Sequence, residues 1–582
     1  MTDAVALTDG VHADLHRAIL GGPNVQRALT PRQCQILHWA ERGATLARTA
    51  EALGLTQADL LAHLDPLLAD GLARLIPGTP APPDTLASLW DEAVQAFGPR
   101  PWLIPADDAP SITFAEAAER VDALARLLTA AGLKRGDRLL VHTAPSADAA
   151  LLFWACARLG IVYAPMDSAA TPDAVRRALD LAQPALVCAD APRAGGLEAV
   201  GAPVMVLGHP LADTRTDLPP PPAEDDIAVI LFTSGTTGEP KGVELSQGAL
   251  TRSARLLAES YGINSTDRLL SLGEFHTMSG LRNPLIVTAA AGAACVLAVE
   301  GERRHPIGAV DLCRRRGVTV LSAVPAFLKM LSGMAVRLEA GAFGPLRLIL
   351  STAADLPPEL SAAIRAVTGA PVLNYYGLTE TCGACTLVTP ADADRAQGSI
   401  GTPAGAVCQI VADDGLILAD DEAGELRVHS ANLMAGYHRR PDLTATMLRD
   451  GWLYTGDLAV RRPDGHIVLV GRRRDIIKTA RGDLLALGAV ERLLEEDPAV
   501  EEAAVCGSRD ERGDERLTAF VRLIANTDAA QTVPRLKARL AERLGPRIAP
   551  REVHVLADFP RGANGKVLKH KLMEDFQSDD GR

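Results

Sequence analysis

The sequence has little cysteine, few aromatic residues and no long uninterrupted hydrophobic run. Its 582 residues include 9 cysteines, and aromatic residues make up 4%. So few cysteines in so long a chain do not indicate a disulfide framework. The longest apolar run, residues 285–299, is too short to span a bilayer, and the first ten residues lack the features of a signal peptide. We therefore expect a cytoplasmic protein with no membrane span.

An excess of positive charge is also absent. The formal net charge is −13 at pH 7 and the pI is about 5.5. Such an acidic chain is poorly suited to nonspecific binding of nucleic acid or anionic membranes. Hydrophobic residues make up 47% and charged residues 23%, which is typical of globular domains with large cores. At about 100–200 residues per domain, the length allows roughly three or four of them.

Residues 1–78 are predicted to form a helical domain that resembles a winged helix-turn-helix. Thr30 caps a helix that opens with Pro31, and short amphipathic segments follow it. The candidate recognition segment, residues 56–72, contains three Asp and no Lys or Arg. A helix that enters the major groove usually carries cations. We therefore expect a docking or structural role for this domain, and nucleic acid is not the expected partner.

Helical and β-like patterns alternate after a proline-rich linker at residues 80–83. Short apolar runs at residues 138–142, 185–188 and 228–232 are typical of buried strands. This alternation predicts an α/β fold with largely parallel sheets.

A strand followed by a loop of Thr, Ser and Gly is the first chemical signal. The loop allows close backbone approach to an anion, its hydroxyls add donors without bulk, and Lys241 adds a point charge. It is not a Walker loop, because the second Gly of that motif would fall at Pro240. A Gly/Thr loop standing alone is as often a plain turn. The candidate phosphate ligands are Thr233, Ser234, Gly235, Thr236, Thr237, Gly238 and Lys241.

This loop resembles the phosphate loop of the adenylate-forming superfamily, which includes acyl-CoA synthetases, peptide-synthetase adenylation domains and luciferases. Further motifs follow in the family's order, and the resemblance covers about residues 84–575. They are Asn374-Tyr-Tyr-Gly-Leu-Thr-Glu380, Gly424-Glu-Leu, Gly436-Tyr-His-Arg-Arg-Pro, Thr455-Gly-Asp457, Gly471-Arg-Arg-Arg-Asp-Ile-Ile-Lys478 and Pro560-Arg-Gly-Ala-Asn-Gly-Lys-Val-Leu-Lys569. Each motif is weak alone, but their common order is specific.

The resemblance implies ATP and Mg²⁺ as the nucleotide substrate and metal. Tyr376 would stack on adenine, Thr379 would bind the α-phosphate, and Glu380 would be the metal ligand, for which a hard carboxylate is suited. Asp457 would accept both ribose hydroxyls, and Arg472 would contact ribose or phosphate. The remaining residues that the resemblance assigns to the nucleotide site are Asn374, Tyr375 and Gly377.

The resemblance also implies two domains that move. A large domain at about residues 84–473 would contain two parallel-sheet subdomains and a distorted β-barrel. A small α+β lid at about residues 475–576 would carry Lys566, which stabilises charge on the α-phosphoryl group during adenylation. Rotation at the hinge, Arg474, would then remove Lys566 and admit an acceptor.

The acid pocket is partly readable. Glu274-Phe-His-Thr-Met-Ser-Gly280 resembles the F-H-x-x-G segment of acyl and aryl acid activators, and no Asp stands where α-amino-acid activators pair the ammonium group. Arg282 could pair with a second carboxylate, but a surface or phosphate-facing Arg is the favoured interpretation. Cys382 and Cys385 form a C-x-x-C pair that we interpret as ordinary thiols. The resemblance assigns the acyl pocket to His276, Gly280, Ala353 and Gly383.

The acceptor is the least determined part. Ala489 stands where the family has the first Glu of an E-I-E element, in a segment that lines the thiol's approach. A carrier-protein phosphopantetheine, coenzyme A and an amine all stay open, and the extra helical domain slightly favours the carrier protein. A ligand-sensing DNA-binding regulator and a non-catalytic scaffold are the alternatives outside enzymology. The intact loop, Glu380, Asp457 and Lys566 argue against both.

Overall fold

The computed structural model describes two strands near the N-terminus and most of the chain from residue 84. The described residues are 3–7, 73–77, 84–195, 197, 203–208, 217–234, 240–334, 341–478, 484–509, 515–545, 549–550, 552–561, 567–569, 571–573 and 576. Contacts divide the chain into two compact units, residues 1–408 with 427–454 and residues 409–426 with 455–582. Within the described part, no helix has the length and apolar character needed to cross a bilayer.

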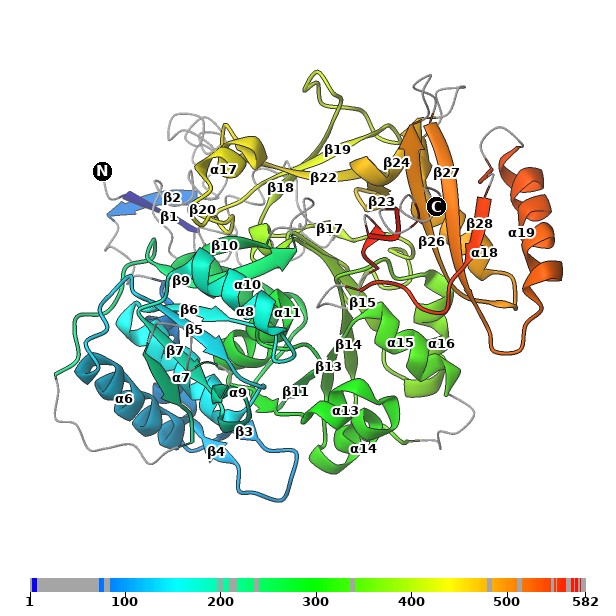
Figure 1. Ribbon diagram of the computed structural model, residues 1–582. Coiled ribbons are helices and arrows are strands. Elements are labelled where there is room, and N and C mark those ends of the chain that lie inside the picture. The colour runs from blue at the N-terminus through cyan, green and yellow to red at the C-terminus, as the bar shows by residue number, and fades with distance from the viewer. Residues whose placement is uncertain are drawn as a thin grey trace. The chain divides into compact units, whose positions relative to one another are not determined.

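The first unit contains a seven-stranded sheet in the order β20-β10-β9-β6-β5-β7-β8 (Figure 1). The strands from β9 to β8 in this order run parallel, and β10 and β20 add antiparallel pairs at one edge. The strand bounds are β5 Arg138–His142, β6 Val162–Pro165, β7 Leu186–Ala189, β8 Val204–Val206, β9 Ile227–Ser234, β10 Pro240–Ser246 and β20 Gly436–Tyr437.

A second, nine-stranded sheet has the order β17-β16-β15-β14-β13-β11-β12-β3-β4. Its central strands, from β15 to β3, are parallel, and β16, β17 and β4 add antiparallel edges. The bounds are β3 Pro101–Ile104, β4 Ile112–Thr113, β11 Arg268–Ser271, β12 Ala294–Val296, β13 Val320–Ala323, β14 Leu348–Ser351, β15 Val372–Tyr376, β16 Thr386–Leu387 and β17 Thr402–Pro403.

The helices of this unit cover both sheets. Those before the phosphate loop are α5 Leu86–Phe97, α6 Phe114–Ala130, α7 Ala147–Leu159, α8 Pro172–Ala182 and α9 Ala191–Ala194. Those after it are α10 Gln247–Ser260, α11 Met278–Leu281, the π-helix η1 Arg282–Val287, α12 Thr288–Ala291, α13 Glu300–Arg304, α14 Pro306–Arg316, α15 Pro325–Gly333, α16 Pro358–Thr368, the 3-10 helix η3 Thr379–Thr381 and α17 Pro441–Met447. Several begin at hydroxyl N-caps, such as Thr85, Thr113 and Ser146, which accept from otherwise unpaired backbone N–H groups.

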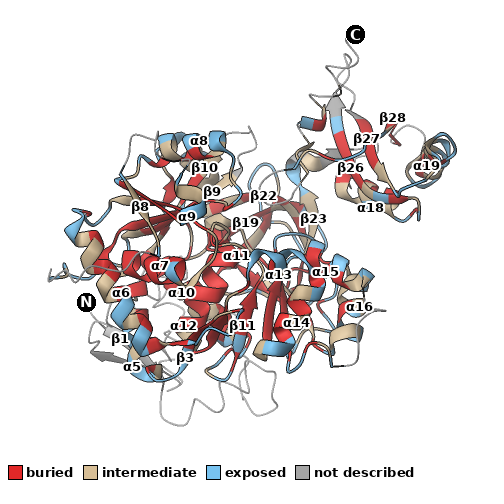
Figure 2. Ribbon diagram, turned by 60° about the horizontal axis from the view of Figure 1, so that its bottom comes forward, coloured by how far each residue is buried: buried red, intermediate tan, exposed pale blue. Residues whose placement is uncertain are grey.

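Side-chain alternation along the strands arranges these elements in α/β/α/β/α layers. Leu139 of β5 faces a central core shared with α5, α6, α7, α10 and the second sheet, whereas its neighbour Leu140 faces α8. In the second sheet, Leu269 joins the same central core and Leu270 faces α14 and α15. Figure 2 shows the buried residues running along these strands and the helices between them. Strands buried on both faces explain the short continuous apolar runs in the sequence.

The second unit begins within a five-stranded sheet, of order β18-β19-β22-β21 with β23 paired to β22. A three-stranded sheet, β26-β27-β28, then packs against α18 and α19 on one face. The bounds are β18 Val407–Val411, β19 Ala423–His429, β21 Leu448–Arg449, β22 Trp452–Arg461, β23 Ile467–Arg472, the 3-10 helix η4 Arg473–Asp475, β24 Ile476–Lys478, β25 Leu484–Ala486, α18 Leu487–Glu495, β26 Val500–Arg509, β27 Glu515–Leu523, α19 Ala529–Leu544 and β28 Glu552–Val555.

The N-terminal segment is described only as a strand pair. β1 (Asp3–Leu7) runs antiparallel to β2 (Ala73–Pro77), with Asp3 opposite Pro77. The helices predicted between these strands lie outside the described residues. The α/β class and the parallel sheets predicted from the alternating pattern are confirmed.

A buried carboxylate ties the start of β11 to its neighbours. Asp267 is almost fully buried and accepts from Arg347 Nε at 2.8 Å, from Arg347 Nη2 at 2.7 Å and from Thr319 Oγ1 at 2.7 Å. Burial alone would raise the pKa of Asp267, but these donors outweigh it and hold the pKa below its usual 3.8. The ionised form is therefore the one that the fold stabilises.

We predict that Asp267→Asn lowers the free energy of unfolding at pH 7 by about 2 kcal/mol, because the Arg347 guanidinium loses its charged partner. Because the folded-state pKa is depressed, this contribution is present above pH 3.8 and is lost as the pH falls through the folded-state value. Urea unfolding measured from pH 7 to pH 3 should show that the difference in the free energy of unfolding between wild type and variant decreases as the pH falls. Asp394→Asn, in the exposed pair with Arg365, is the control that should change nothing. A gap that does not depend on pH would contradict the assignment.

Candidate active site

The phosphate loop joins the two strands of a hairpin. β9 and β10 pair with Thr233 opposite Lys241 and Ser234 opposite Pro240. The loop residues between them, 235–239, and the Ser234 side chain lie outside the described part. Lys241 Nζ lies 5.2 Å from the ring centroid of Tyr437. The hairpin therefore holds the ends of the loop and one cation in register.

Tyr437 links this hairpin to the predicted metal ligand. Its strand β20 pairs with β10, placing Tyr437 opposite Val243. The Tyr437 hydroxyl donates to Glu380 Oε1 at 2.6 Å, and Met434 N donates to the Glu380 carbonyl at 2.8 Å. A carboxylate has about four lone-pair sites, so this bond leaves capacity for a cation. An oriented hard oxygen donor fits Mg²⁺.

Glu380 and Thr379 lie on a compact turn, η3, directly after β15. Leu378 N donates to Thr381 Oγ1 at 2.9 Å, and Gly383 N donates to the Leu378 carbonyl at 2.8 Å. A Cβ at Gly377 would lie 2.4 Å from the Gly383 carbonyl carbon. Only glycine allows the backbone to close this tightly, and the closure fixes the direction of the Glu380 side chain.

Neighbouring residues of β15 serve different roles. The Tyr375 ring is buried at 1% exposure, and its hydroxyl accepts from Asn283 Nδ2 at 3.0 Å. The Tyr375 side chain therefore belongs to the core, while alternation directs Tyr376 to the other face of the strand. Asn374 Nδ2 donates to the Ser399 carbonyl at 3.3 Å.

Arg282 is buried beneath this turn and is neither on a helix surface nor facing a phosphate. It is 0% exposed, and its Nη1 donates to the Cys382 carbonyl at 2.7 Å and to Ser253 Oγ at 3.0 Å. A Cβ at Gly383 would lie 3.0 Å from this Nη1. Because Arg282 has no accessible surface, we interpret it as a support of the turn from the interior of the protein. Cys382 and Cys385 are buried free thiols in the same segment.

His276 lies against a carboxylate that the sequence did not single out. Glu274 Oε2 is 3.4 Å from His276 Nδ1, and Glu274 Oε1 is 3.3 Å from Arg303 Nη2. Ser168 also donates to Glu274, from Oγ at 3.0 Å and from N at 3.2 Å. Burial raises the pKa of Glu274, but the contacts with His276, Ser168 and Arg303 outweigh it and bring the pKa from 4.5 to about 2.

The same carboxylate belongs to a group that has the composition of a metal site. Asp167, Glu274 and His276 bring their ligand atoms within 4.8 Å of one another. Arg303 already pairs with Glu274, so a second cation at this point would be repelled. We interpret the group as a balanced polar cluster that orients His276.

Gly280 and Ala353 have distinctive backbone settings. A Cβ at Gly280 would lie 2.1 Å from the Glu274 carbonyl, so the glycine is required by the turn itself. Ala353 is exposed and has φ of +76°, a conformation that costs a residue with a side chain of order 1–2 kcal/mol. Strain of this kind often marks functional positions.

The second unit brings two predicted ribose ligands together. Asp457 and Arg472 are opposite each other in the β22–β23 pair, and Arg472 Nε lies 2.8 Å from Asp457 Oδ1. The Asp457 side chain is only 5% exposed, whereas that of Arg472 is 42% exposed. The backbone of Arg474 lies in η4, but its side chain and Lys566 lie outside the described residues.

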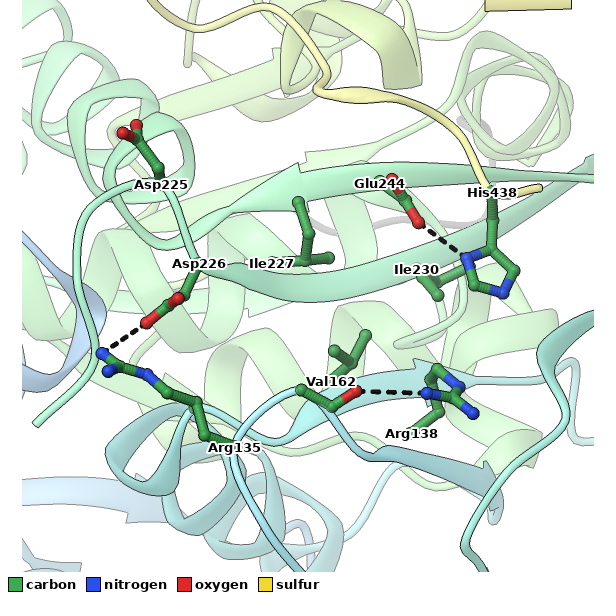
Figure 3. A pocket seen from close by; sticks show the side chains of 11 residues that line it. Arg135, Arg138, Val162, Asp225, Asp226, Ile227, Ile230, Glu244 and His438 are labelled. Carbon is green, nitrogen blue, oxygen red and sulfur yellow. Dashed lines mark hydrogen bonds and ion pairs between the residues drawn. The ribbon is translucent and has the colours of Figure 1, made fainter. Parts of the chain in front are cut away.

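A cavity of about 460 Å³ lies at the amino ends of the parallel strands, opposite the carboxyl ends where the candidate site lies. Figure 3 shows Arg135 directed toward Asp226 and His438 toward Glu244, and these pairs are 2.5 Å and 2.6 Å apart. Arg138, at the start of β5, donates to the carbonyls of Ala182 and Gln183. Ligands of open α/β sheets bind outside the carboxyl ends of the strands. We therefore assign this cavity no part in the candidate site.

A carboxylate positioned beside a phosphate-loop hairpin in an α/β fold defines a nucleotide-binding enzyme. The AMP-binding enzyme family matches residues 90–438, and the C-terminal domain of AMP-binding enzymes matches residues 489–566. The chain therefore belongs to the AMP-binding enzymes of the adenylate-forming superfamily, and it is an AMP-forming acid ligase.

Relatives match most of the chain. The sulfoacetate–CoA ligase of Cupriavidus necator is 31% identical over an alignment of 513 residues, which covers 84% of this chain and 97% of that protein. The phenyloxazoline synthase MbtB of a Mycobacterium species is 32% identical over 80% of this chain but only 40% of that protein. The O-succinylbenzoate coenzyme A synthetase of Bacillus subtilis, solved with ATP and a magnesium ion, has a TM-score of 0.74 and 27% identity, over 83% of this chain and 99% of that one.

We predict that Tyr437→Phe raises the KM for Mg·ATP roughly tenfold, because the charged Glu380 carboxylate loses the hydrogen bond that orients it. ATP–pyrophosphate exchange at varied Mg·ATP should show this with little change in the KM for the acid. Tyr454→Phe is the matched control, because its hydroxyl accepts from Arg427 Nη1 at 3.0 Å and does not touch Glu380. Equal effects of the two variants would contradict a specific role for Tyr437.

Proposed function

We propose that this enzyme adenylates a small carboxylic acid with ATP, releases pyrophosphate, and transfers the acyl group to the thiol of a phosphopantetheine arm. The observation that carries the proposal is the convergence of Lys241, Tyr437 and Glu380 at the base of the phosphate loop. It joins a cation, an oriented carboxylate and a Thr/Gly loop, which is what a polyphosphate with its metal needs.

In the first half-reaction, a carboxylate oxygen of the acid attacks the α-phosphorus and pyrophosphate leaves. Lys241 and the Thr/Gly loop hold the β- and γ-phosphates, and Thr379 contacts the α-phosphate. Glu380 holds Mg²⁺, which neutralises phosphate charge when bound. Lys566 stabilises the charge that develops on the α-phosphoryl oxygens. The Asp457–Arg472 pair fits the ribose, since the carboxylate accepts from its hydroxyls while the arginine fixes its orientation.

In the second half-reaction, a thiol attacks the acyl carbonyl and AMP leaves. The phosphopantetheine arm is common to coenzyme A and to carrier proteins. Support for coenzyme A comes from relatives such as the sulfoacetate–CoA ligase, which the chain matches over 97% of its length. Support for a carrier protein comes from the phenyloxazoline synthase match and from the extra N-terminal segment.

The pocket favours an acid other than an ordinary α-amino acid. His276 and its carboxylate partner Glu274 stand in the segment that resembles the acyl-binding motif. The acid panel should include sulfonated acids and dicarboxylic acids, because one relative is named for sulfoacetate. Arg282 is fully buried, so a second acidic group would have to be recognised by other residues, His276 among them.

Lys566→Ala is expected to abolish acid-dependent exchange of pyrophosphate into ATP, because the charge that develops on the α-phosphoryl oxygens would lose its positioned lysine. Exchange should fall by about a hundredfold or more, as for loss of a positioned transition-state charge. Lys571→Ala, an exposed lysine in the same segment, is the control that should keep normal exchange. Normal exchange in the Lys566 variant would contradict its assignment.

The acceptor is tested with the acid that gives the strongest exchange. Wild-type enzyme, ATP and that acid are incubated separately with coenzyme A, with a holo carrier protein and with hydroxylamine, and the products are identified by mass spectrometry. A thioester with either of the first two supports the proposal and distinguishes the sources. Hydroxamate as the only product, with no thioester, would contradict a thiol acceptor.

A further inference from the structure

Helix α18 provides side chains that reach the free edge of strand β26. β26 is an edge strand, and its outward N–H groups at Ala503 and Val505 are not used by β27. Two carboxylates of α18 accept from them: Glu495 Oε1 from Ala503 N at 3.3 Å and Glu491 Oε1 from Val505 N at 2.8 Å. Satisfying an edge strand in this way closes it to further pairing.

Glu491 has a second partner that lies far along the chain. Lys569 Nζ is 2.7 Å from the same Oε1, and both side chains are partly exposed, at 29% and 20%. On the other side of β26, Cys506 Sγ donates to the Lys569 carbonyl at 3.6 Å. Lys569 is therefore held by its ammonium group and by its backbone, and it is not a free surface charge.

The chain before Lys566 is held in a matching way. Arg561 Nη2 pairs with Glu502 Oε2 on β26. Arg561 and Val567 form an antiparallel bridge, and Leu568 N donates to the Pro560 carbonyl at 2.7 Å. The residues on either side of segment 562–566 are thus joined to each other. An ion pair ties the preceding side to β26 and another ties the following side to α18.

Apolar packing gives this attachment a second component. Phe559 and Leu572, at 3% and 2% exposure, pack with Ala504, Cys506 and Phe520 on the face of the sheet opposite α18 and α19. The hydrophobic contacts fix the segment on the sheet. They are not directional, so the ion pairs are what set its position along the strand.

We propose that the two ion pairs Glu491–Lys569 and Glu502–Arg561, which we call the Lys566 clamp, are positioning devices that fix the reach of Lys566 during adenylation. The inference rests on the proposed role of Lys566. In this proposal the four residues act through the backbone on either side of the lysine. Because misplacing a catalytic group by about 1 Å can cost up to roughly a hundredfold in rate, partly exposed ion pairs of modest strength can still control the rate.

The clamp predicts that the two half-reactions separate. Lys566 serves adenylation and is withdrawn before acyl transfer, so loosening the clamp should slow only the first step. We expect Lys569→Met and Glu491→Gln each to lower kcat for ATP–pyrophosphate exchange roughly three- to tenfold, with the KM for ATP and acid unchanged. Glu491→Gln keeps an acceptor for Val505 N and removes only the charge. Thioester formation from synthetic acyl-AMP should stay within about twofold of wild type, and Lys569→Arg should restore exchange.

Arg535→Met is the matched control, because it breaks an ion pair of the same unit, Arg535–Asp497, that includes none of the described residues between 559 and 573. Hydrogen exchange of peptides covering residues 560–573 gives a readout that does not depend on activity. It should become faster in Lys569→Met and stay unchanged in Arg535→Met.

Equal losses in both half-reactions would overturn the proposal in favour of a purely structural role. Unchanged exchange kinetics together with unchanged hydrogen exchange would overturn it as well. If wild type forms no acyl-AMP with any acid, the proposed function fails. In that case faster hydrogen exchange in Lys569→Met would still establish the ion pair as the anchor of the segment.

Discussion

The pairing of the two-residue strand β20 with β10 is the constraint on which the candidate nucleotide site of the first unit depends. It carries Tyr437 from a distant part of the chain to the phosphate-loop hairpin, where its hydroxyl meets Glu380 at 2.6 Å and its ring lies beneath Lys241. The phosphate-loop hairpin, the turn that carries Glu380 and the segment that carries Tyr437 are thereby fixed to one another. Without this pairing, the Glu380 carboxylate would lose the hydrogen bond from Tyr437.

Local patterns predicted what depends on neighbouring residues. Apolar runs at residues 138–142 and 228–232 correspond to β5 and β9, and the order of the motifs identified the family. The contacts of Tyr437 could not be predicted in this way, because 57 residues separate it from Glu380 and a two-residue strand has no periodicity. The sequence contains the motif that begins at Gly436, but it does not show that Tyr437 is the residue of that motif that contacts the Glu380 carboxylate.

Buried polar residues were the other limit of sequence reasoning. An arginine near an acyl-binding motif suggested a surface or ligand contact, yet Arg282 is fully enclosed and bonded to Ser253 and the Cys382 carbonyl. Arginine is rarely buried without a carboxylate partner, so the sequence favoured an exposed position for Arg282. Asn283, the next residue, supplies one accepting oxygen. The other two belong to the backbone of the turn and to a helix more than a hundred residues upstream of that turn, and no sequence pattern reveals those two.

The functional carboxylates share one physical feature: each is held by two different kinds of partner. Glu274 is bonded by Ser168 and paired with Arg303, and Glu491 accepts a strand N–H while pairing with Lys569. A neutral hydrogen bond fixes the direction of the carboxylate, and a nearby cation adds a charge-assisted contact. Together they leave the carboxylate little freedom to rotate, so its partner, His276 or Lys569, is placed without further reorganisation. Preorganisation of this kind is what charge stabilisation in a transition state requires.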